Sequence, residues 1–282
     1  MTRRCSRRQT RRVLGPLLAN LLLISAGSFI LLPYIWMILT SLKPADEIFL
    51  DEIRLLPERW AALENYHRAL TAVPLARFMG NGLFVSGAIV VLQVLIAVPC
   101  GYALAKTSFR GARILLATVL LCLLIPKEVT AIPLYLAFAE IGILDTYLVL
   151  ILPSSISVFA IFLFSQVFRQ FPDEIIAASR LDGMRDYEIV WRVIVPNMWP
   201  AIGAFAVLSF VAHWNELYWP LIAITSMDLA PPPLGLSFFR SQEASSDFGA
   251  LMAAATIISA PLVFAFLFAQ GVFLRGFAYR QL

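Results

Sequence analysis

The sequence predicts an all-α, polytopic membrane protein that crosses the bilayer six times. Hydrophobic residues make up 60% of its 282 residues and charged residues only 14%, against roughly 45–50% and about 25% in soluble domains. Six apolar stretches each approach the length of about 20 helical residues that a bilayer requires. Strands of a membrane β-barrel would instead alternate apolar and polar residues over about 10 positions, and these stretches do not alternate.

The expected spans are joined by short loops after the second one. They are Val13–Leu42, Phe78–Ala105, Ile114–Ala139, Thr146–Phe168, Val193–Ala223 and Phe248–Leu274. The chain is thereby divided into a basic arm (1–12), a first transmembrane helix (13–42), an extracytoplasmic segment (43–77), a five-helix core (78–276) and a tail (277–282). A charged loop, 171–196, interrupts the core between the fourth and fifth spans.

The distribution of lysine and arginine predicts the orientation. The arm has many arginines and no acid, and further basic residues follow the second, fourth and last spans: Lys106, Arg110, Arg113, Arg169, Arg180, Arg185, Arg192, Arg275 and Arg280. Such residues are retained on the cytoplasmic side, so both termini and the 171–196 loop are expected in the cytoplasm. The first apolar stretch far exceeds the roughly 7–15 residues of a cleavable signal, and we expect an uncleaved span.

The third span is expected to be kinked or locally unwound. Pro126 and Pro133 bracket Lys127 and Glu128 near the middle of this span, and proline disrupts the hydrogen bonds of a helix interior. Ionised side chains at this depth usually face a bundle interior or a water-filled cavity. Lys127 and Glu128 therefore either line a transport pathway or form a structural pair that reaches toward an interface.

The fifth span contains a second polar group of residues. Asn215 and Glu216 follow His213, and Trp219 comes shortly afterwards. Trp219 suits an aromatic belt at the outer interface, whereas Asn215 and Glu216 need polar partners and are candidates for an outer gate or cavity. The outer loop Ser226–Phe248 is expected to have extended backbone at its run of three prolines.

The 171–196 loop predicts a helical hairpin. Pro172 and the two acids after it suit the start of a helix, and Asp182 with Gly183 suits its end and a chain reversal. A second helix should follow and stop at Pro196, with one apolar face formed by Tyr187, Val190, Trp191 and Ile194.

The sequence contains none of the common enzyme motifs. It lacks the GxxxxGK[ST] phosphate loop and the GxSxG elbow, and it has only two histidines. Cys5, Cys100 and Cys122 have neither disulfide nor metal-site spacing. We therefore expect no catalytic residue, no metal and no cofactor bound by this chain.

Several segments carry a family resemblance. They are LPYIWMILTSLKPADEIF, NYHRAL, GYALAKTSFRG, IPKEVTAIPLYL, ILDTYLVLILP, FPDEIIAASRLDGMRDYEIVWRVIVPNMWPAI, HWNELYWPL and QGVFLRGF. Over nearly its whole length the chain resembles the permease subunits of bacterial ATP-binding-cassette (ABC) importers that use an external solute-binding protein, in their carbohydrate-uptake branch. This resemblance implies the type I importer fold.

The resemblance also implies that the 171–196 loop contains a coupling helix, which docks in a groove of an ATPase subunit. The implied coupling residues are Glu174, Ala177, Ala178, Ser179, Asp182 and Gly183. The family's usual acid is missing from the Ala177-Ala178-Ser179 trio, which puts one ion pair with the ATPase in doubt. The substrate pathway would involve Lys127, Glu128, Asn215 and Glu216.

The implied assembly has a second homologous permease, two ATPase subunits that use ATP and Mg, and an extracytoplasmic binding protein. The chain itself would be non-catalytic and would carry a sugar or sugar-like solute, with glycerol-3-phosphate or a polyol as the alternative. A competing hypothesis is a secondary transporter with Lys127, Glu128 and Glu216 as an ion relay, although the repeated halves of such proteins are not evident. An enzyme acting on lipid would need a cytoplasmic acid or metal motif, which the sequence lacks.

Overall fold

The computed structural model describes residues 3–49, 54–242 and 247–278, with side chains in 19–49, 54–240 and 247–267. Within these ranges all regular elements are helical, which confirms the predicted all-α class. The chain forms two compact units, one of residues 1–69 with 243–257 and one of residues 70–242 with 258–282. Each unit is described by itself.

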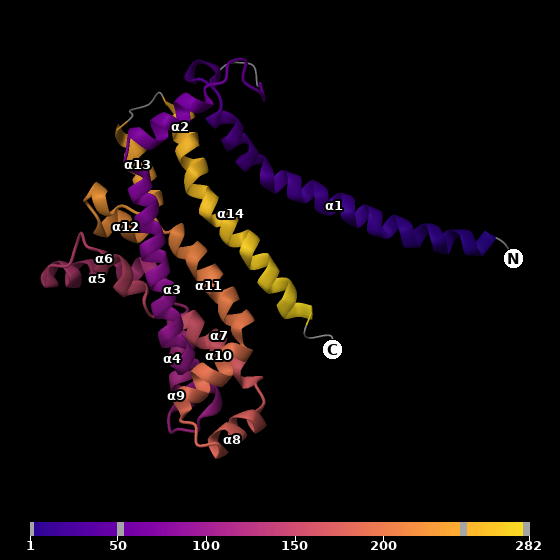
Figure 1. The fold of residues 1–282 in the computed structure, drawn as a ribbon, viewed down its shortest axis with the longest axis vertical. Helices are drawn as coiled ribbons and strands as arrows, with labels where there is room; N and C mark the ends of the chain where they lie inside the picture. Colours follow the sequence, from indigo (N-terminus) through magenta and orange to yellow (C-terminus); the bar gives the residue numbers. More distant parts are fainter. Residues whose placement is uncertain (1–2, 50–53, 243–246, 279–282) are drawn as a thin grey trace. The chain divides into compact units, whose positions relative to one another are not determined.

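Three helices are long and apolar enough to cross a bilayer (Figure 1). They are α1 (Arg3–Ser41, over Ala19–Ser41), α3 (Leu75–Lys106) and α14 (Phe248–Ala278, over Phe248–Leu267). Three further spans are bent pairs: α4 (Ala112–Cys122) with α5 (Lys127–Ile141) at 96°, Tyr147–Ser154 with α7 (Val158–Arg169) at 41°, and Asp186–Asn197 with α11 (Trp199–Trp214) at 83°. If each bent pair counts as one span, the described residues hold up to the six spans that the sequence predicts, with the fifth over residues 186–214 and not over Val193–Ala223.

The bend between α4 and α5 lies where the prolines predict a distortion. Pro126 has extended backbone and directly precedes α5, so the break falls just before Lys127. Pro133 lies inside α5. The predicted kink of the third span is therefore confirmed, and it is a break between two helices.

The first unit contains α1, a short 3₁₀ turn, η1 (Ala45–Glu47), and most of α2 (Ala62–Thr71). The buried Asn65 amide donates hydrogen bonds of 2.8 Å to the carbonyl oxygens of both Ser41 and Lys43. Arg68 forms an ion pair of 2.6 Å with Asp247. These contacts fix α2 against the end of α1 and the start of α14 within this unit.

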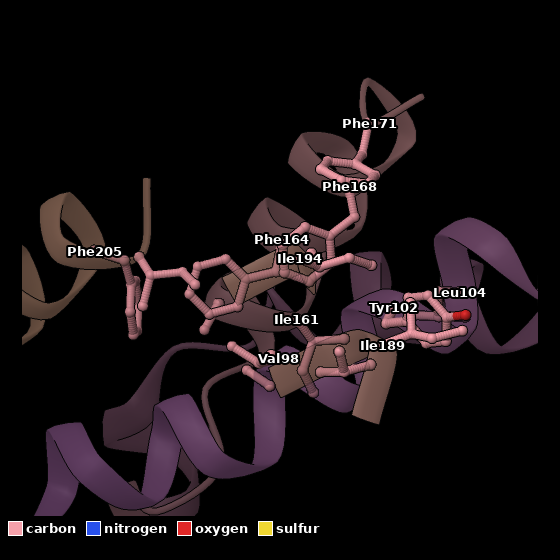
Figure 2. Close-up of a cluster of buried hydrophobic side chains, with 14 of the residues drawn as sticks. Val98, Tyr102, Leu104, Ile161, Phe164, Phe168, Phe171, Ile189, Ile194 and Phe205 are labelled. Carbon is pink, nitrogen blue, oxygen red and sulfur yellow. The ribbon is translucent and has the colours of Figure 1, made fainter. Parts of the chain in front are cut away.

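The second unit is organised around α3, and α7 and α11 pack along it (Figure 1). A buried apolar cluster joins these helices; it includes Phe164, Phe168, Ile194 and Phe205 (Figure 2). Gly101 allows the close approach of α3 and α7, because a Cβ at this position would lie 2.7 Å from the Cβ of Phe164.

The 171–196 loop forms the predicted hairpin, although its second half differs from the prediction. After α8 (Asp173–Leu181) the chain continues through α9 (Asp186–Glu188), a π-helix, η3 (Ile189–Ile194), and α10 (Val195–Asn197). The helix thus passes Pro196, which suits the first turn of α10. Because a π-helix bonds residue i to i+5, the 3.6-residue period fails. Tyr187 is 60% and Trp191 37% exposed, whereas Ile189, Val190 and Ile194 are buried.

The loop after the fifth span also differs from the prediction at its prolines. It contains α12 (Tyr218–Ala223), η4 (Met227–Leu229) and α13 (Pro232–Gln242). Pro232 and Pro233 start α13, so the expected extended backbone at all three prolines is wrong. Proline is tolerated in the first helical turn because its missing N–H would have no partner there.

The fourth span starts with α6 (Tyr147–Ile151) and η2 (Leu152–Ser154).

Candidate functional sites

One face of α8 is exposed along its whole length, and we call it the α8 face. It consists of Glu174, Ala177, Ala178 and Leu181, which are all exposed. These positions are spaced i, i+3, i+4 and i+7 and so share one side of a helix. Ile176 and Ser179 lie on the opposite side, 3% and 7% exposed. Of the predicted coupling trio, two alanines are therefore available to a partner, while Ser179 packs inward.

The end of α8 depends on a left-handed glycine. Gly183 has φ = +81°, a conformation that costs other residues about 1–2 kcal/mol. The backbone N–H of Met184 then donates to the carbonyl oxygen of Ser179, and that of Asp182 to Ala178. A Cβ at Gly183 would meet no atom within 4 Å, so the restriction at this position is conformational.

Lys106, the last residue of α3, holds the start of α8. Its ammonium group donates to the carbonyl oxygen of Phe171 at 2.6 Å and pairs with the Asp173 carboxylate at 2.6 Å. A longer contact of 3.5 Å reaches the carbonyl oxygen of Arg169. The Lys106 side chain is only 6% exposed, so these oxygens replace its water. Lys106 thereby joins α3 to the end of α7 and the start of α8.

Tyr102, one turn earlier on α3, holds the other end of α8. Its hydroxyl group lies 3.1 Å from Asp186 and 3.3 Å from Arg180, and these two residues form an ion pair of 3.1 Å. The hydrogen bond to Asp186 raises the pKa of Arg180 above its usual value. The hairpin is therefore attached to α3 at both ends of α8.

The broken third and fifth spans meet in an ion pair. Lys127 starts α5 directly after its break, and Glu216 follows the end of α11. Their charged groups lie 2.5 Å apart, with the lysine side chain 75% and the glutamate side chain 20% exposed. Glu128 is exposed, and Asn215 is exposed and bonds to the Val211 carbonyl oxygen of its own helix. The structure thus brings together two of the four predicted pathway residues.

A buried glutamine that the sequence analysis missed lies between α3 and α11. Gln93 is only 4% exposed. Its amide nitrogen lies 2.7 Å from the carbonyl oxygen of Ser154 and 3.1 Å from Nε2 of His213. Its amide oxygen accepts a hydrogen bond of 2.6 Å from the Ser209 hydroxyl group. With the amide donating, His213 Nε2 accepts, which assigns the neutral imidazole with its proton on Nδ1. A single glutamine in an otherwise apolar span was the available signal.

The N-terminal end of α3 holds the loop after the fifth span. Asn81 donates to the carbonyl oxygens of Asp228 and Ala230 at 2.9 and 3.0 Å. Arg77 pairs with the Asp228 carboxylate at 2.6 Å. The Asp145 carboxylate accepts from backbone N–H groups of the same loop. This loop and the α8 hairpin therefore contact opposite ends of one helix.

The comparisons with known proteins identify the family. The model of the "binding-protein-dependent transport system inner membrane component" matches residues 97–279. The arabinooligosaccharides transport system permease protein AraQ of Halalkalibacterium halodurans is 31% identical and aligns with 94% of this chain and 97% of its own length. The sn-glycerol-3-phosphate transport system permease protein UgpE of Escherichia coli is 26% identical, over 92% and 94% of the two chains.

A solved structure shares the fold. It is a bacterial ABC transporter involved in the import of the acidic polysaccharide alginate; one of its chains superposes with a TM-score of 0.80, 22% identity, and coverage of 93% of this chain and 97% of that chain. The chain belongs to the family of binding-protein-dependent ABC transporter permeases.

Family membership confirms the predicted class of protein. The chain is a non-catalytic, multi-pass membrane subunit of the bacterial inner-membrane ABC importer family and part of a binding-protein-dependent transporter complex. It binds no cofactor, and ATP is used by partner ATPases. The secondary-transporter and lipid-enzyme hypotheses are thereby set aside.

Proposed function

We propose that this chain forms half of the pathway through which an ABC importer carries a carbohydrate into the cell. The other half would come from a second, homologous permease, and two ATPase subunits would bind on the cytoplasmic side. An extracytoplasmic binding protein would deliver the solute. Both termini and the α8 hairpin would then be cytoplasmic, as the lysine and arginine distribution predicts.

The α8 face is the observation that carries this proposal. Ala177 and Ala178 leave the middle of the face flat, so a partner can approach its backbone closely. Leu181 is 89% exposed, and such an apolar side chain in an expected cytoplasmic loop favours burial in a protein groove. Glu174 adds a negative charge near the N-terminus of α8, where the helix dipole stabilises it. These features suit the docking of one helix in a groove of an ATPase subunit.

The attachment of α8 to α3 suggests how ATPase movement reaches the outer side. α3 has 32 residues and spans about 48 Å at about 1.5 Å per residue, which exceeds the roughly 30 Å of a bilayer core. Lys106 and Tyr102 fasten one end to the hairpin, and Asn81 fastens the other to the loop after the fifth span. A displacement of α8 would therefore move α3 and this loop together.

The Lys127–Glu216 pair is proposed to border the pathway. Lys127 lies at the break of the third span, and Glu216 lies directly after the end of α11. Helix ends and unpaired backbone groups at such places need a polar environment. The large exposure of Lys127 leaves its ammonium group open on one side. In the assembled transporter this side would face the second permease or the solute. Glu128 and Asn215 are exposed and directly adjoin Lys127 and Glu216 in the sequence. They would extend the polar surface.

The substrate class is inferred from the relatives. AraQ is named for arabinooligosaccharides and UgpE for sn-glycerol-3-phosphate, so a neutral sugar and an anionic phosphate ester are both represented. The higher identity to AraQ favours an oligosaccharide. Calorimetry on the cognate binding protein distinguishes them: tight binding of an arabino-oligosaccharide supports the proposal, whereas selective binding of glycerol-3-phosphate supports the alternative.

The coupling role is tested by enlarging the α8 face. Ala178→Trp should overfill the docking groove, so the ATPase should no longer co-purify in detergent, while the permease still accumulates in the membrane. Ala112→Trp is the matched control, because it adds the same side chain at the other expected cytoplasmic turn. If the Ala178→Trp transporter keeps its ATPase and full uptake, α8 is not the docking element.

A further inference from the structure

A small cavity lies among α3, η2 and the segment after α11. It is lined in part by Ser86, Ser154, His213, Glu216 and Trp219, and its free volume is about 20 Å³. A cavity needs roughly 10–15 Å³ to hold one water molecule. The space therefore fits a single water and excludes a sugar ring.

Ser86 is the reason to regard this cavity as occupied. It is 1% exposed, and within the described residues its Oγ is the one buried side-chain oxygen or nitrogen without a hydrogen-bond partner. Buried hydroxyl groups are almost always bonded to protein or to ordered water. The orphan oxygen belongs to a residue that lines a cavity of the right size.

Other buried serines of this chain behave differently. Ser165 Oγ donates to the Phe162 carbonyl oxygen at 2.7 Å, and Ser179 Oγ to Ile175 at 2.8 Å. Such bonds to the preceding helical turn are the usual way for a serine within a helix to satisfy its hydroxyl group. Ser86 makes no such bond, and so a partner outside its own helix is required.

We propose that the cavity is a binding site for one ordered water, held by Ser86 Oγ and by the polar groups of Ser154, His213 and Glu216. An internal water typically makes about three hydrogen bonds, and these four residues offer enough donors and acceptors. The site lies next to the Gln93 hydrogen bonds and gives the Glu216 carboxylate a second partner besides Lys127. It does not depend on the cargo or on the ATPase contact.

The water can be detected by X-ray hydroxyl-radical footprinting of the assembled transporter in lipid nanodiscs. Irradiated water oxidises the side chains beside it, so His213 and Trp219 should be labelled. Brief mixing with ¹⁸O water before the X-ray pulse shows which water supplied the oxygen added to a side chain. Oxygen from a trapped water is ¹⁶O, and oxygen from bulk solvent is ¹⁸O. Trp214, which is fully buried and bonded to the Ile258 carbonyl oxygen, serves as the internal reference.

Ser86→Val fills the cavity and removes the hydroxyl group. We expect this variant to lose the ¹⁶O label at His213 and Trp219 several-fold, with the matched control Ser165→Val unchanged. If the valine variant does not assemble, Ser86→Ala replaces it and should also lower the ¹⁶O label. Absence of ¹⁶O label in the unmodified protein, or an undiminished label in the Ser86 variant, would overturn the proposal.

Discussion

Lys106→Met should detach the α8 hairpin from α3 without removing it from the protein. Methionine keeps the length and the apolar stem of the lysine but has no ammonium group. The start of α8 would then lose its hydrogen bond to the Phe171 carbonyl oxygen and its ion pair with Asp173, both at 2.6 Å. Asp173 is 83% exposed and can return to water, so the main loss is the attachment itself.

The size of the effect follows from these contacts. Hydrogen bonds to a charged group contribute about 1.5–3 kcal/mol, and the exposure of Asp173 favours the lower half of this range. A loss of about 2 kcal/mol corresponds to about a 30-fold shift toward the detached hairpin, since every 1.4 kcal/mol is about tenfold. Such a shift leaves the hairpin folded most of the time and yet opens it far more often.

Amide hydrogen exchange of the reconstituted transporter measures this opening. In Lys106→Met, the amides of residues 173–183 should exchange up to about 30-fold faster, and less solute should be taken up per ATP hydrolysed. Arg113→Met is the control, because it removes another exposed positive charge close to the membrane. Unchanged exchange in the hairpin of Lys106→Met would refute the reasoning that Lys106 fastens α8 to α3.

Three further changes test neighbouring parts of the account. Gly183→Val should destabilise the end of α8 by about 1–2 kcal/mol, because position 183 has a positive φ; faster amide exchange of the last turn of α8 measures this. Gly183→Asn should have a milder effect. Equal effects of the two substitutions would rule out a conformational cause. Glu216→Ala should lower solute uptake while the protein stays at normal abundance in the membrane. The double variant Lys127→Glu with Glu216→Lys, which exchanges the two charges, should restore part of the lost uptake. No restoration would mean that the ion pair has no direct role. Asp145→Ala removes the carboxylate to which the backbone N–H groups of Thr225 and Ser226 donate, and should increase proteolysis of the loop at these two residues. An unchanged cleavage rate would exclude a holding role for Asp145.

The first half of the hairpin could be predicted from the sequence because local rules determine it. Proline and acids at the start and Asp182 with Gly183 at the end are short-range signals, and α8 occupies the expected residues. The second half follows a longer hydrogen-bond step, and the 3.6-residue pattern placed Tyr187 and Trp191 on the wrong side. A hydrophobicity pattern does not mark a π-helix. In the structure Ile189 and Ile194, the first and last residues of this π-helix, are both buried.

The contacts between distant segments could not be predicted in the same way. Lys127 and Glu216 were both expected to need polar surroundings, but 89 positions separate them, and only the fold shows that they pair. Gln93 was missed because a single polar residue in a span has no periodicity to indicate its partner. Lys106 counted only among the basic residues that predict the orientation, and no sequence pattern singled out Tyr102, because their contacts with the hairpin depend on the fold.

Site-specific crosslinking from the α8 face tests the central claim most directly. A cysteine introduced as Ala178→Cys and loaded with a short photoactivated crosslinker should join this chain to the ATPase subunit in the intact transporter. Arg110→Cys, at the exposed turn before α4, should give far less of this product. Efficient crosslinking from position 178 that is lost when the ATPase subunit is omitted agrees with the account. If position 178 crosslinks only to lipid, or no better than position 110, α8 does not dock on the ATPase.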